Sequence, residues 1–424
     1  MSALALQGGL PVRTKKFTSW PVFDERDREA LLQVFESGKW GGFPSPNTWA
    51  RKLAEKFAAL HDAKYGICAA NGTVTLEIAL RAAGIRAGDE VIVPSYTWVA
   101  TAQAPIQVNA VPVFADVDPE TYCLDPKSVE TALTPRTRAI IPVHLGCRMA
   151  DMDALMVLAK KHNLVVIEDC AHAHGAKWNG KGAGSLGDLG SFSMQSSKLM
   201  TAGEGGMILT SDKILEERCQ SIVNCGRKEP GYDSFAGQVP AGNYRITELQ
   251  AALLAVACDR LEEQTILREK NIAYLEKRLP EIPGITPLKR DARLSRQGAY
   301  QYILRYDKTA WDGVHRDRLV EALGKEGIPC DGYFYIPLYD GDLFAPFVDY
   351  FPALAERYGA GKDWRAAMRT PIAERAAYEE SIWLHHALFM GGTEDVDDVV
   401  EALQKIFEHR DKLGKEANSS RDRG

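Results

Sequence analysis

Short apolar runs and amphipathic stretches alternate through the first half of the chain. Helical spacing of apolar residues predicts helices at 24–37, 76–83, 129–133 and 152–162. Continuous apolar runs predict buried strands at 65–69, 90–94, 111–117, 139–144, 164–167, 189–194 and 206–210. Strands that alternate with helical segments favour an α/β fold with a parallel sheet covered on both faces.

The second half of the chain predicts a smaller unit. Thr247 is placed to cap a long helix at 248–275, which would carry the chain away from the first sheet. Strand and helix patterns then alternate again at 300–306, 316–325, 381–386 and 394–412. With 424 residues the chain exceeds one ordinary domain. We therefore expect a large domain with an N-terminal arm over 1–260, a small C-terminal α/β domain over 261–413 and a disordered polar tail over 414–424.

Composition narrows the class of protein. The net charge is −6 and no basic block occurs, which argues against nucleic acid as the main partner. The chain has no run of about 18 apolar residues, so no membrane span is expected. The start of the chain lacks the pattern of a signal peptide. Eight cysteines at irregular spacing suit reduced thiols, and we expect a cytoplasmic protein.

Lys198 stands in an unusual setting for a lysine. Small and neutral polar residues surround it, and apolar strand-like segments lie on both sides. Burial would disfavour the ammonium form, lower the pKa and make the neutral amine a nucleophile. Such an amine forms a Schiff base with an aldehyde cofactor. The alternative is a lysine whose side chain extends from a loop into solvent.

Asp169 lies at the end of the predicted strand at 164–167, one residue beyond Glu168. Ligands of open α/β sheets bind beyond the carboxyl ends of the strands. A buried carboxylate there can hold a proton on a pyridine nitrogen, and Lys198 can bind the aldehyde. These are the two protein groups that pyridoxal phosphate requires. Taken alone, Asp169 is equally compatible with a cap after the strand.

Two further features fit a flat, phosphorylated ligand. The segment 71–75 has Gly and Thr before a predicted helix, where backbone N–H groups and the helix dipole favour a phosphate. Thr73 can equally be an ordinary helix cap. Trp98 follows the strand at 90–94 and can stack on a ring, although aromatic residues at strand ends often belong to the core. No Gly-x-Gly-x-x-Gly follows the first strand, which disfavours a dinucleotide.

A metal-dependent hydrolase is the alternative from a different class. Asp169, His172 and His174 have the character of metal ligands, with His144 or His385 completing the set. This interpretation leaves Lys198 and the loop at 71–75 without a role. A cofactor-binding protein without turnover is a third possibility.

Several motifs together resemble one known family, the fold-type I pyridoxal-phosphate aminotransferases of the DegT/StrS group, which act on keto-sugars and keto-cyclitols. The resemblance extends from about residue 20 to the last helix and is closest to scyllo-inosose and 2-deoxy-scyllo-inosose aminotransferases and amino-hydroxybenzoate synthases. It rests on the segments at 71–73, 92–98, 142–144, 168–175, 191–206, 242–245 and 383–386.

The resemblance implies a fold and a first set of roles. The fold would be a large mixed, mostly parallel sheet of the seven-stranded type with a smaller C-terminal α/β domain. Lys198 would be the Schiff-base lysine and the proton shuttle, and Asp169 the partner of the pyridinium nitrogen. His172 would lie near the 3-hydroxyl of the cofactor, a position that is often Gln in relatives. Trp98 would stack on the ring.

The phosphate contacts implied by the resemblance come from two subunits. Gly72, Thr73 and Ser193 match contacts within one chain. Asn243 matches a phosphate ligand that arrives from the neighbouring subunit, so the active unit would be a homodimer with shared active sites. The implied cofactor is pyridoxal 5'-phosphate, with pyridoxamine 5'-phosphate as its intermediate form.

The implied reaction moves an amino group from L-glutamine or L-glutamate to a keto-cyclitol or keto-sugar, in secondary-metabolite biosynthesis. The first alternative is an aromatising enzyme of the 3-amino-5-hydroxybenzoate synthase type, and nucleotide-linked keto-sugars come next. No basic cluster suited to a diphosphate stands out, which favours a free cyclitol. The candidate substrate residues are Arg227, Tyr333, Tyr335, His385 and His386.

Overall fold

In the computed structural model, residues 3–43, 45–344, 348–359 and 363–414 are described. The first sheet has seven strands in the order β1-β9-β8-β5-β4-β2-β3. Their bounds are β1 Tyr65–Ala69, β2 Glu90–Pro94, β3 Val111–Ala115, β4 Thr137–Ile140, β5 Val165–Asp169, β8 Leu189–Ser193 and β9 Gly206–Thr210. β9 pairs antiparallel with both neighbours, and the other pairs are parallel. The predicted mixed, mostly parallel seven-stranded sheet is confirmed.

Two smaller sheets contain the remaining strands. The four-stranded sheet has the order β10-β12-β14-β13, and its pairs are all antiparallel. Its strands are β10 Ile285–Pro287, β12 Gln301–Tyr306, β13 Cys330–Asp331 and β14 Ser381–His385. In a three-stranded sheet, β11 Leu294–Arg296 pairs with β6 Lys177–Trp178, which pairs with β7 Lys181–Gly182. The chain therefore returns from its C-terminal half to pair with its N-terminal half.

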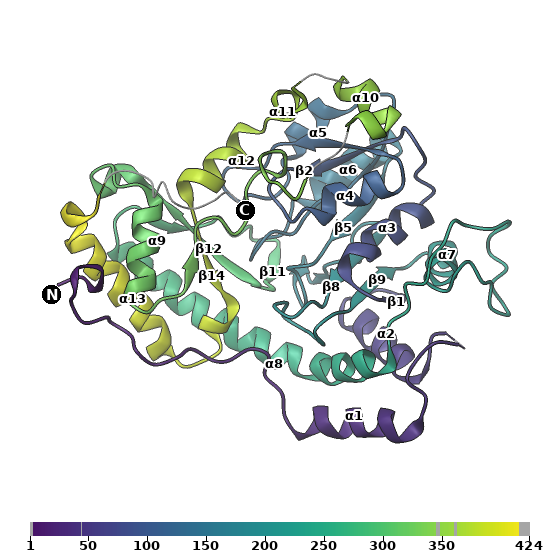
Figure 1. Cartoon of the computed structure of the whole chain (residues 1–424), viewed down its shortest axis with the longest axis horizontal. Helices are drawn as coiled ribbons and strands as arrows, with labels where there is room; N and C mark the ends of the chain where they lie inside the picture. The colour runs from purple at the N-terminus through teal and green to yellow at the C-terminus, as the bar shows by residue number, and fades with distance from the viewer. Residues whose placement is uncertain (1–2, 44, 345–347, 360–362, 415–424) are drawn as a thin grey trace.

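Thirteen α-helices occur in the part of the chain that the structure describes. They are α1 Glu25–Ser37, α2 Thr48–Leu60, α3 Gly72–Ala82, α4 Ala100–Gln107, α5 Pro126–Ala132, α6 Met152–His162, α7 Lys213–Val223, α8 Glu248–Arg278, α9 Arg316–Lys325, α10 Pro352–Tyr358, α11 Trp364–Ala367, α12 Pro371–Arg375 and α13 Thr393–Glu408. Figure 1 shows α9 and α13 beside the four-stranded sheet, the seven-stranded sheet at the other end, and α8 running beneath both.

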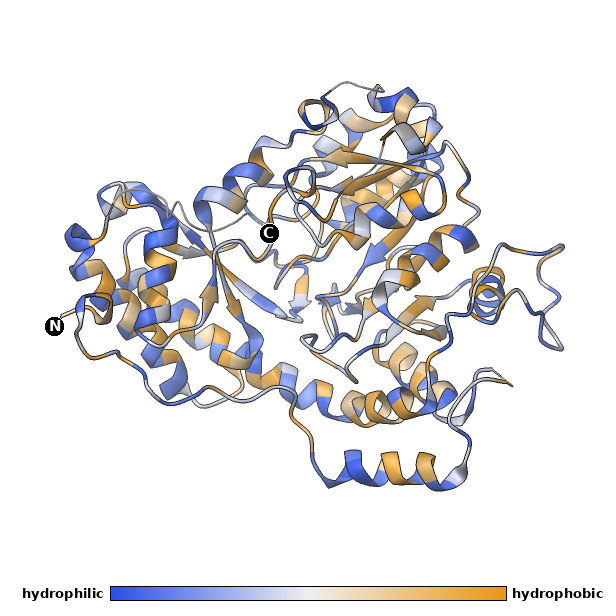
Figure 2. Cartoon of the chain, viewed as in Figure 1, coloured by the Kyte–Doolittle hydropathy of each residue, from blue (hydrophilic) through white to orange (hydrophobic). Residues whose placement is uncertain are grey.

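The sequence explains the main elements. Every residue of β2 is buried, as expected for a parallel strand covered on both faces. Figure 2 shows the strands of the large sheet as predominantly hydrophobic. α8 begins where predicted, because the Thr247 side chain accepts from the Gln250 N–H and the Gln250 side chain accepts from the Thr247 N–H. One hydrophobic cluster surrounds the large sheet and a second surrounds the small one.

Some predicted boundaries differ from the structure. α3 begins four residues before the predicted start at 76, because Asn71 caps it: its side chain accepts from the Val74 N–H at 3.0 Å. β4 ends at Ile140, before the predicted end at 144. The predicted domain boundary at 260 lies inside α8 and remains a prediction. Residues 415–424 of the predicted tail lie outside the described residues.

The surroundings of the cysteines and the character of the helices bear on the class of protein. Seven of the eight cysteines are at least partly buried. Within the described residues, we find no helix that combines the length and the apolar character needed to cross a membrane.

Arg148 connects the large sheet to the segments around β11. The residue lies between β4 and α6 and is buried. Its guanidinium donates to the carbonyl oxygens of Leu288 at 2.5 Å and Lys289 at 2.9 Å, and to the Gln297 side chain at 2.8 Å. Hydrogen bonds from a charged group are stronger than neutral ones, so this residue fixes the two halves relative to each other.

We predict that Arg148→Met lowers the free energy of unfolding by about 3 kcal/mol, because it leaves buried carbonyl oxygens without donors. The midpoint of denaturant unfolding, followed by circular dichroism, measures the loss. Arg138→Met is the control, since Arg138 is exposed, bonds to carbonyl oxygens of its own segment and has a long, exposed ion pair with Asp89 at 3.9 Å. Equal midpoints for the two variants would contradict the assigned role of Arg148.

Candidate active site

A cavity of about 660 Å³ opens at the carboxyl edge of the large sheet. The ends of β5 and β8 and the start of α3 form one side, and residues next to β12, β13 and β14 form the other. Ligands of open α/β sheets bind at this edge. The cavity is lined by nine of the residues that the sequence predicted for the site: Gly72, Thr73, Trp98, Asp169, His172, Ser193, Lys198, Tyr335 and His385.

Lys198 is buried in this cavity, in the loop after β8. Its exposed fraction is 9%. Within the described residues, no hydrogen bond or ion pair engages its Nζ. Burial lowers the pKa of Lys198 to about 8, and the charge of Asp169 counteracts this only partly. Roughly a tenth of the amine is therefore neutral at pH 7, far more than for an exposed lysine, and a nucleophile requires this neutral form.

Asp169 ends β5 and is held by two donors. Its Oδ2 accepts from the Thr101 hydroxyl at 2.9 Å, and its Oδ1 accepts from the Ala171 N–H at 3.2 Å. Burial nevertheless raises the pKa of Asp169, because these donors and the distant Lys198 do not offset desolvation. A cation or a protonated ring nitrogen bound next to this carboxylate would restore the charged form.

The N-terminus of α3 forms a cradle for an anion. Backbone N–H groups at a helix start have no partner within the helix, and the dipole favours negative charge. Gly72 lies so close to Ser193 that a Cβ on residue 72 would come within 2.4 Å of the Ser193 Cβ. Thr73 and Ser193 both line the cavity next to this helix start. Lys198 is the one Lys or Arg among the described lining residues.

The hydrogen bonds of His172 fix its tautomer. The Gly146 N–H donates to Nδ1 at 3.1 Å, so a neutral ring carries its hydrogen on Nε2. Burial keeps the ring neutral, because it lowers the pKa of His172 well below the usual value. Nε2 lies 3.0 Å from the Tyr335 hydroxyl and donates to it. The hydroxyl hydrogen of Tyr335 is then available to a ligand in the cavity.

Four predicted site residues lie outside the cavity of this chain. Arg227 and Asn243 are exposed; Arg227 lies near the Phe43 ring, and Asn243 forms a backbone bridge with Asn224. The hydroxyl of Tyr333 donates to Asp317 at 2.7 Å. His386 is buried, with Nε2 3.2 Å from the Ser197 carbonyl oxygen.

The metal alternative does not match the arrangement of side chains. Among the described residues, the group whose ligand atoms lie within 4.8 Å of one another is His144, Glu168 and Cys170, without Asp169, His172 or His174. The His172 ring packs against Tyr300 at 4.4 Å between centroids, and the His174 ring against Phe192 at 5.4 Å. The two rings therefore belong to different surroundings, although only one residue separates them.

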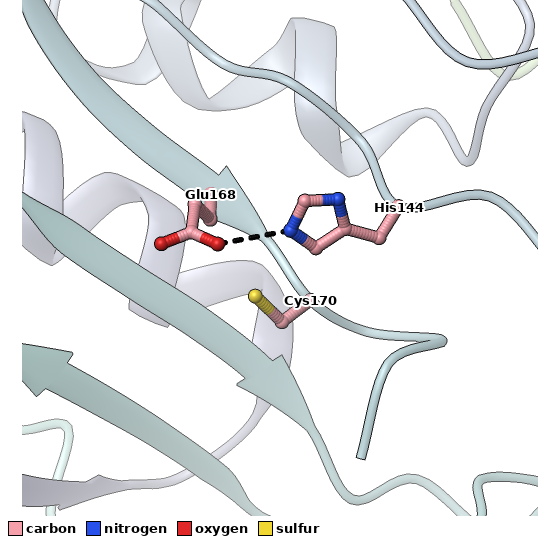
Figure 3. Close-up of side chains that lie close together, drawn as sticks. All are labelled: His144, Glu168 and Cys170. Atoms are coloured by element: carbon pink, nitrogen blue, oxygen red, sulfur yellow. Dashed lines mark hydrogen bonds and ion pairs between the residues drawn. The ribbon is translucent and has the colours of Figure 1, made fainter. Parts of the chain in front are cut away.

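The group that does come together is occupied by internal hydrogen bonds. Figure 3 shows His144 and Glu168 joined at 2.9 Å beside the Cys170 sulfur. The Glu168 carboxylate also accepts from the N–H groups of Gly184, Leu186 and Gly187 at 2.7–2.9 Å. Burial raises the pKa of the Cys170 thiol, so it stays protonated. Glu168 therefore holds the loop before β8 and leaves little capacity for a metal ion.

Sequence reasoning missed three polar residues of the site. Thr101, on α4, supports Asp169. Its hydroxyl also lies 3.2 Å from that of Thr97, but Thr97 precedes α4, so helical periodicity gives no signal for this pair. Tyr300 and Ser197 are joined at 2.7 Å beside Lys198. The pattern around Tyr300 predicts only a strand, so nothing local marks its function.

Comparison with known proteins identifies the family. The model of the DegT/DnrJ/EryC1/StrS aminotransferase family matches residues 21–404. The chain belongs to this aminotransferase family. The resemblance inferred from the sequence motifs is thereby confirmed, and so is the expectation of a transaminase.

Three similar proteins cover nearly the whole chain. A protein of Streptoalloteichus tenebrarius with the provisional name L-glutamine:3-amino-2,3-dideoxy-scyllo-inosose aminotransferase is 49% identical, over 97% of this chain and 99% of its own. The L-glutamine:2-deoxy-scyllo-inosose aminotransferase of the same organism is 37% identical over 97% and 99%. The crystal structure of 3-amino-5-hydroxybenzoic acid synthase has a TM-score of 0.81 and 32% identity, over 94% of this chain and 100% of that chain.

The pKa of Lys198 yields a prediction for the protein freed of bound small molecules. Only the neutral amine is acylated, so modification of Lys198 by a small acylating reagent should be half-maximal near pH 8. Mass spectrometry of the Lys198 peptide across a pH series measures the midpoint, and the exposed Lys127 serves as a reference for reagent delivery. A midpoint near about 10.4, the value of an exposed amine, would contradict the burial of Lys198.

Proposed function

We propose that this protein transfers an amino group from L-glutamine to a keto-cyclitol of the scyllo-inosose type, with pyridoxal phosphate as cofactor. The observation that carries the proposal is the shared cavity of Lys198 and Asp169. Lys198 offers an amine that forms no ion pair with any described residue, and Asp169 offers a carboxylate at a strand end. The family supplies the reaction class, and the names of the relatives that are 37–49% identical supply the donor and the acceptor.

The residues present fit the cofactor. The cradle at Gly72 admits no side chain, so the backbone can approach a phosphate, and Thr73 and Ser193 add hydroxyl groups. Trp98 is half exposed at the cavity and offers its ring face for stacking. When bound, pyridoxal phosphate supplies an electron sink for the bond changes at the amino carbon.

The side chains of the cavity would hold the cofactor in place and move protons. The Asp169 carboxylate, oriented by Thr101, would hold the proton of the ring nitrogen. Lys198 would hold the aldehyde carbon through its Nζ, and the same amine, once free, would take up and release protons. The neutral His172 donates its Nε2–H to the Tyr335 hydroxyl, which leaves the hydroxyl hydrogen of Tyr335 for a ligand in the cavity.

The character of the cavity supports a neutral polyhydroxy ketone as acceptor. Its described lining includes donors and acceptors suited to hydroxyl groups, among them Gln195, Gln301, Tyr335 and His385. A diphosphate would need cationic partners, and Lys198 is already committed to the amine chemistry. These features favour a free cyclitol over a nucleotide-linked sugar. The likeness to 3-amino-5-hydroxybenzoic acid synthase keeps an aromatising reaction as the second candidate.

We further propose a homodimer with shared sites. Asn243 is exposed and lies away from the cavity of its own chain, as a residue that serves a neighbouring cavity would. Arg227 lies exposed in the same long connection between α7 and α8. Apart from Lys198, the described residues that line the cavity include no Lys or Arg, so an amide and a guanidinium from a second chain would complete the phosphate cradle.

The reaction is tested with a panel of ketones and both amino donors. We expect L-glutamine with 2-deoxy-scyllo-inosose or its 3-amino derivative to give the aminocyclitol, identified by mass. Lys198→Ala should fold normally, lack the Schiff-base absorbance of the pyridoxal phosphate enzyme, and lose activity by about 10²–10⁴-fold or more. Lys127→Ala is the matched control, because Lys127 is exposed. A coloured, fully active Lys198→Ala protein would refute the assignment, and an aromatic product would favour the second candidate.

Shared sites are tested by mixing two inactive variants. Lys198→Ala and Asn243→Ala dimers are dissociated together and reassembled. If Asn243 serves the neighbouring cavity, each mixed dimer has one intact site, and random assembly of equal amounts should restore roughly a quarter of the wild-type activity. If Asn243 acts in its own chain, each mixed dimer site contains one lesion and no activity returns.

A further inference from the structure

Tyr300 lies against the lysine amine. The Lys198 Nζ lies 4.2 Å from the centroid of the Tyr300 ring, within the range at which a cation is attracted to an aromatic face. Tyr300 stands directly before β12, far from Lys198 in the sequence, and both line the cavity. The His172 ring packs against Tyr300 as well, at 4.4 Å between centroids.

A chain of hydrogen bonds holds the Tyr300 ring in place. The Ser197 hydroxyl lies 2.8 Å from the Gln195 Oε1, which can only accept, so Ser197 donates to it. The Ser197 oxygen must then accept from the Tyr300 hydroxyl, 2.7 Å away. Burial raises the pKa of Tyr300, so its hydroxyl keeps the required hydrogen. The Ser197 N–H also donates to Gln195, which fixes the residue next to the lysine.

We propose that Tyr300 is a positioning residue whose ring face stabilises the ammonium form of Lys198 and whose hydroxyl bond to Ser197 keeps the ring there. This inference rests on the proposed function, in which Lys198 leaves the aldehyde and moves a proton. A free amine that moves protons must take up a proton as readily as it gives one away. Burial disfavours the ammonium form of Lys198, whereas the negative face of the Tyr300 ring favours it.

The groups that face Lys198 explain why a ring is needed. Asp169 approaches from β5, and its charge favours the ammonium form; Glu204 lines the same cavity from the segment before β9. The buried histidines after β5, His172 and His174, are neutral, and His385 lines the cavity from β14 with a pKa lowered by burial. In the proposed holoenzyme Asp169 is engaged by the ring nitrogen. Tyr300 then remains to favour the charged amine.

The test changes the charge on the ring face while keeping an aromatic ring of similar size. Tyr300→Phe keeps the ring, and trifluorinated and pentafluorinated phenylalanine at the same position progressively weaken the negative charge of its face. The pKa of Lys198 is measured by acylation and mass spectrometry on protein freed of cofactor. We expect Tyr300→Phe, which keeps the ring but loses the bond to Ser197, to lower the midpoint slightly. The pentafluorinated ring should lower it by about one pH unit relative to wild type, with the trifluorinated ring between them.

The controls separate this inference from the proposed function. Fluorination at Tyr306, which is buried in the small sheet and bonds to the Val314 carbonyl oxygen, should leave the Lys198 midpoint unchanged. Circular dichroism confirms that each variant folds. A midpoint that does not fall with fluorination at position 300 overturns the role of Tyr300. A different result would contradict the proposed function: the wild-type protein would show no Schiff-base absorbance when it is given pyridoxal phosphate.

Discussion

The site depends on burying an amine and a carboxyl group in one cavity without joining them as an ion pair. Removing a charge from water is costly, and an amine responds by losing its proton. The pKa of Lys198 falls from the usual 10.5 to about 8, which corresponds to roughly 3 kcal/mol against its charged form. A direct bond to Asp169 would cancel this effect and leave no neutral amine. Their separation keeps both groups ready for a ligand that contacts each of them.

The large sheet produces this separation. Asp169 ends β5 and Lys198 follows β8, and these two strands are parallel neighbours. Their carboxyl ends therefore meet at one edge, while the loop after β8 carries the lysine beyond the reach of the acid. Glu168 restrains the loop before β8 through three backbone N–H groups. The buried acid beside Asp169 is thus part of the framework that positions both reactive groups.

The fold and half of the site follow from local sequence patterns. The apolar runs predict most strands of the large sheet, and chemistry at strand ends predicts Asp169 and the loop at Gly72. Lys198 was identified because uncharged neighbours surround it. The ends of elements were less predictable, since Asn71 starts α3 earlier than the apolar pattern does. The sequence does not predict the roles of Thr101 and Tyr300, because these roles arise from contacts across the fold that hydrophobic periodicity does not encode.

The second half of the cavity explains why the smaller sheet is needed. Tyr300, Tyr335 and His385 enter from segments around β12, β13 and β14, and they contact groups that the large sheet presents. Each of these contacts depends on how the two sheets sit against each other, which Arg148 helps to fix. The large sheet alone would expose Lys198 to water and return its pKa toward that of an ordinary amine. Reactivity of the lysine is therefore a property of the packed pair of sheets.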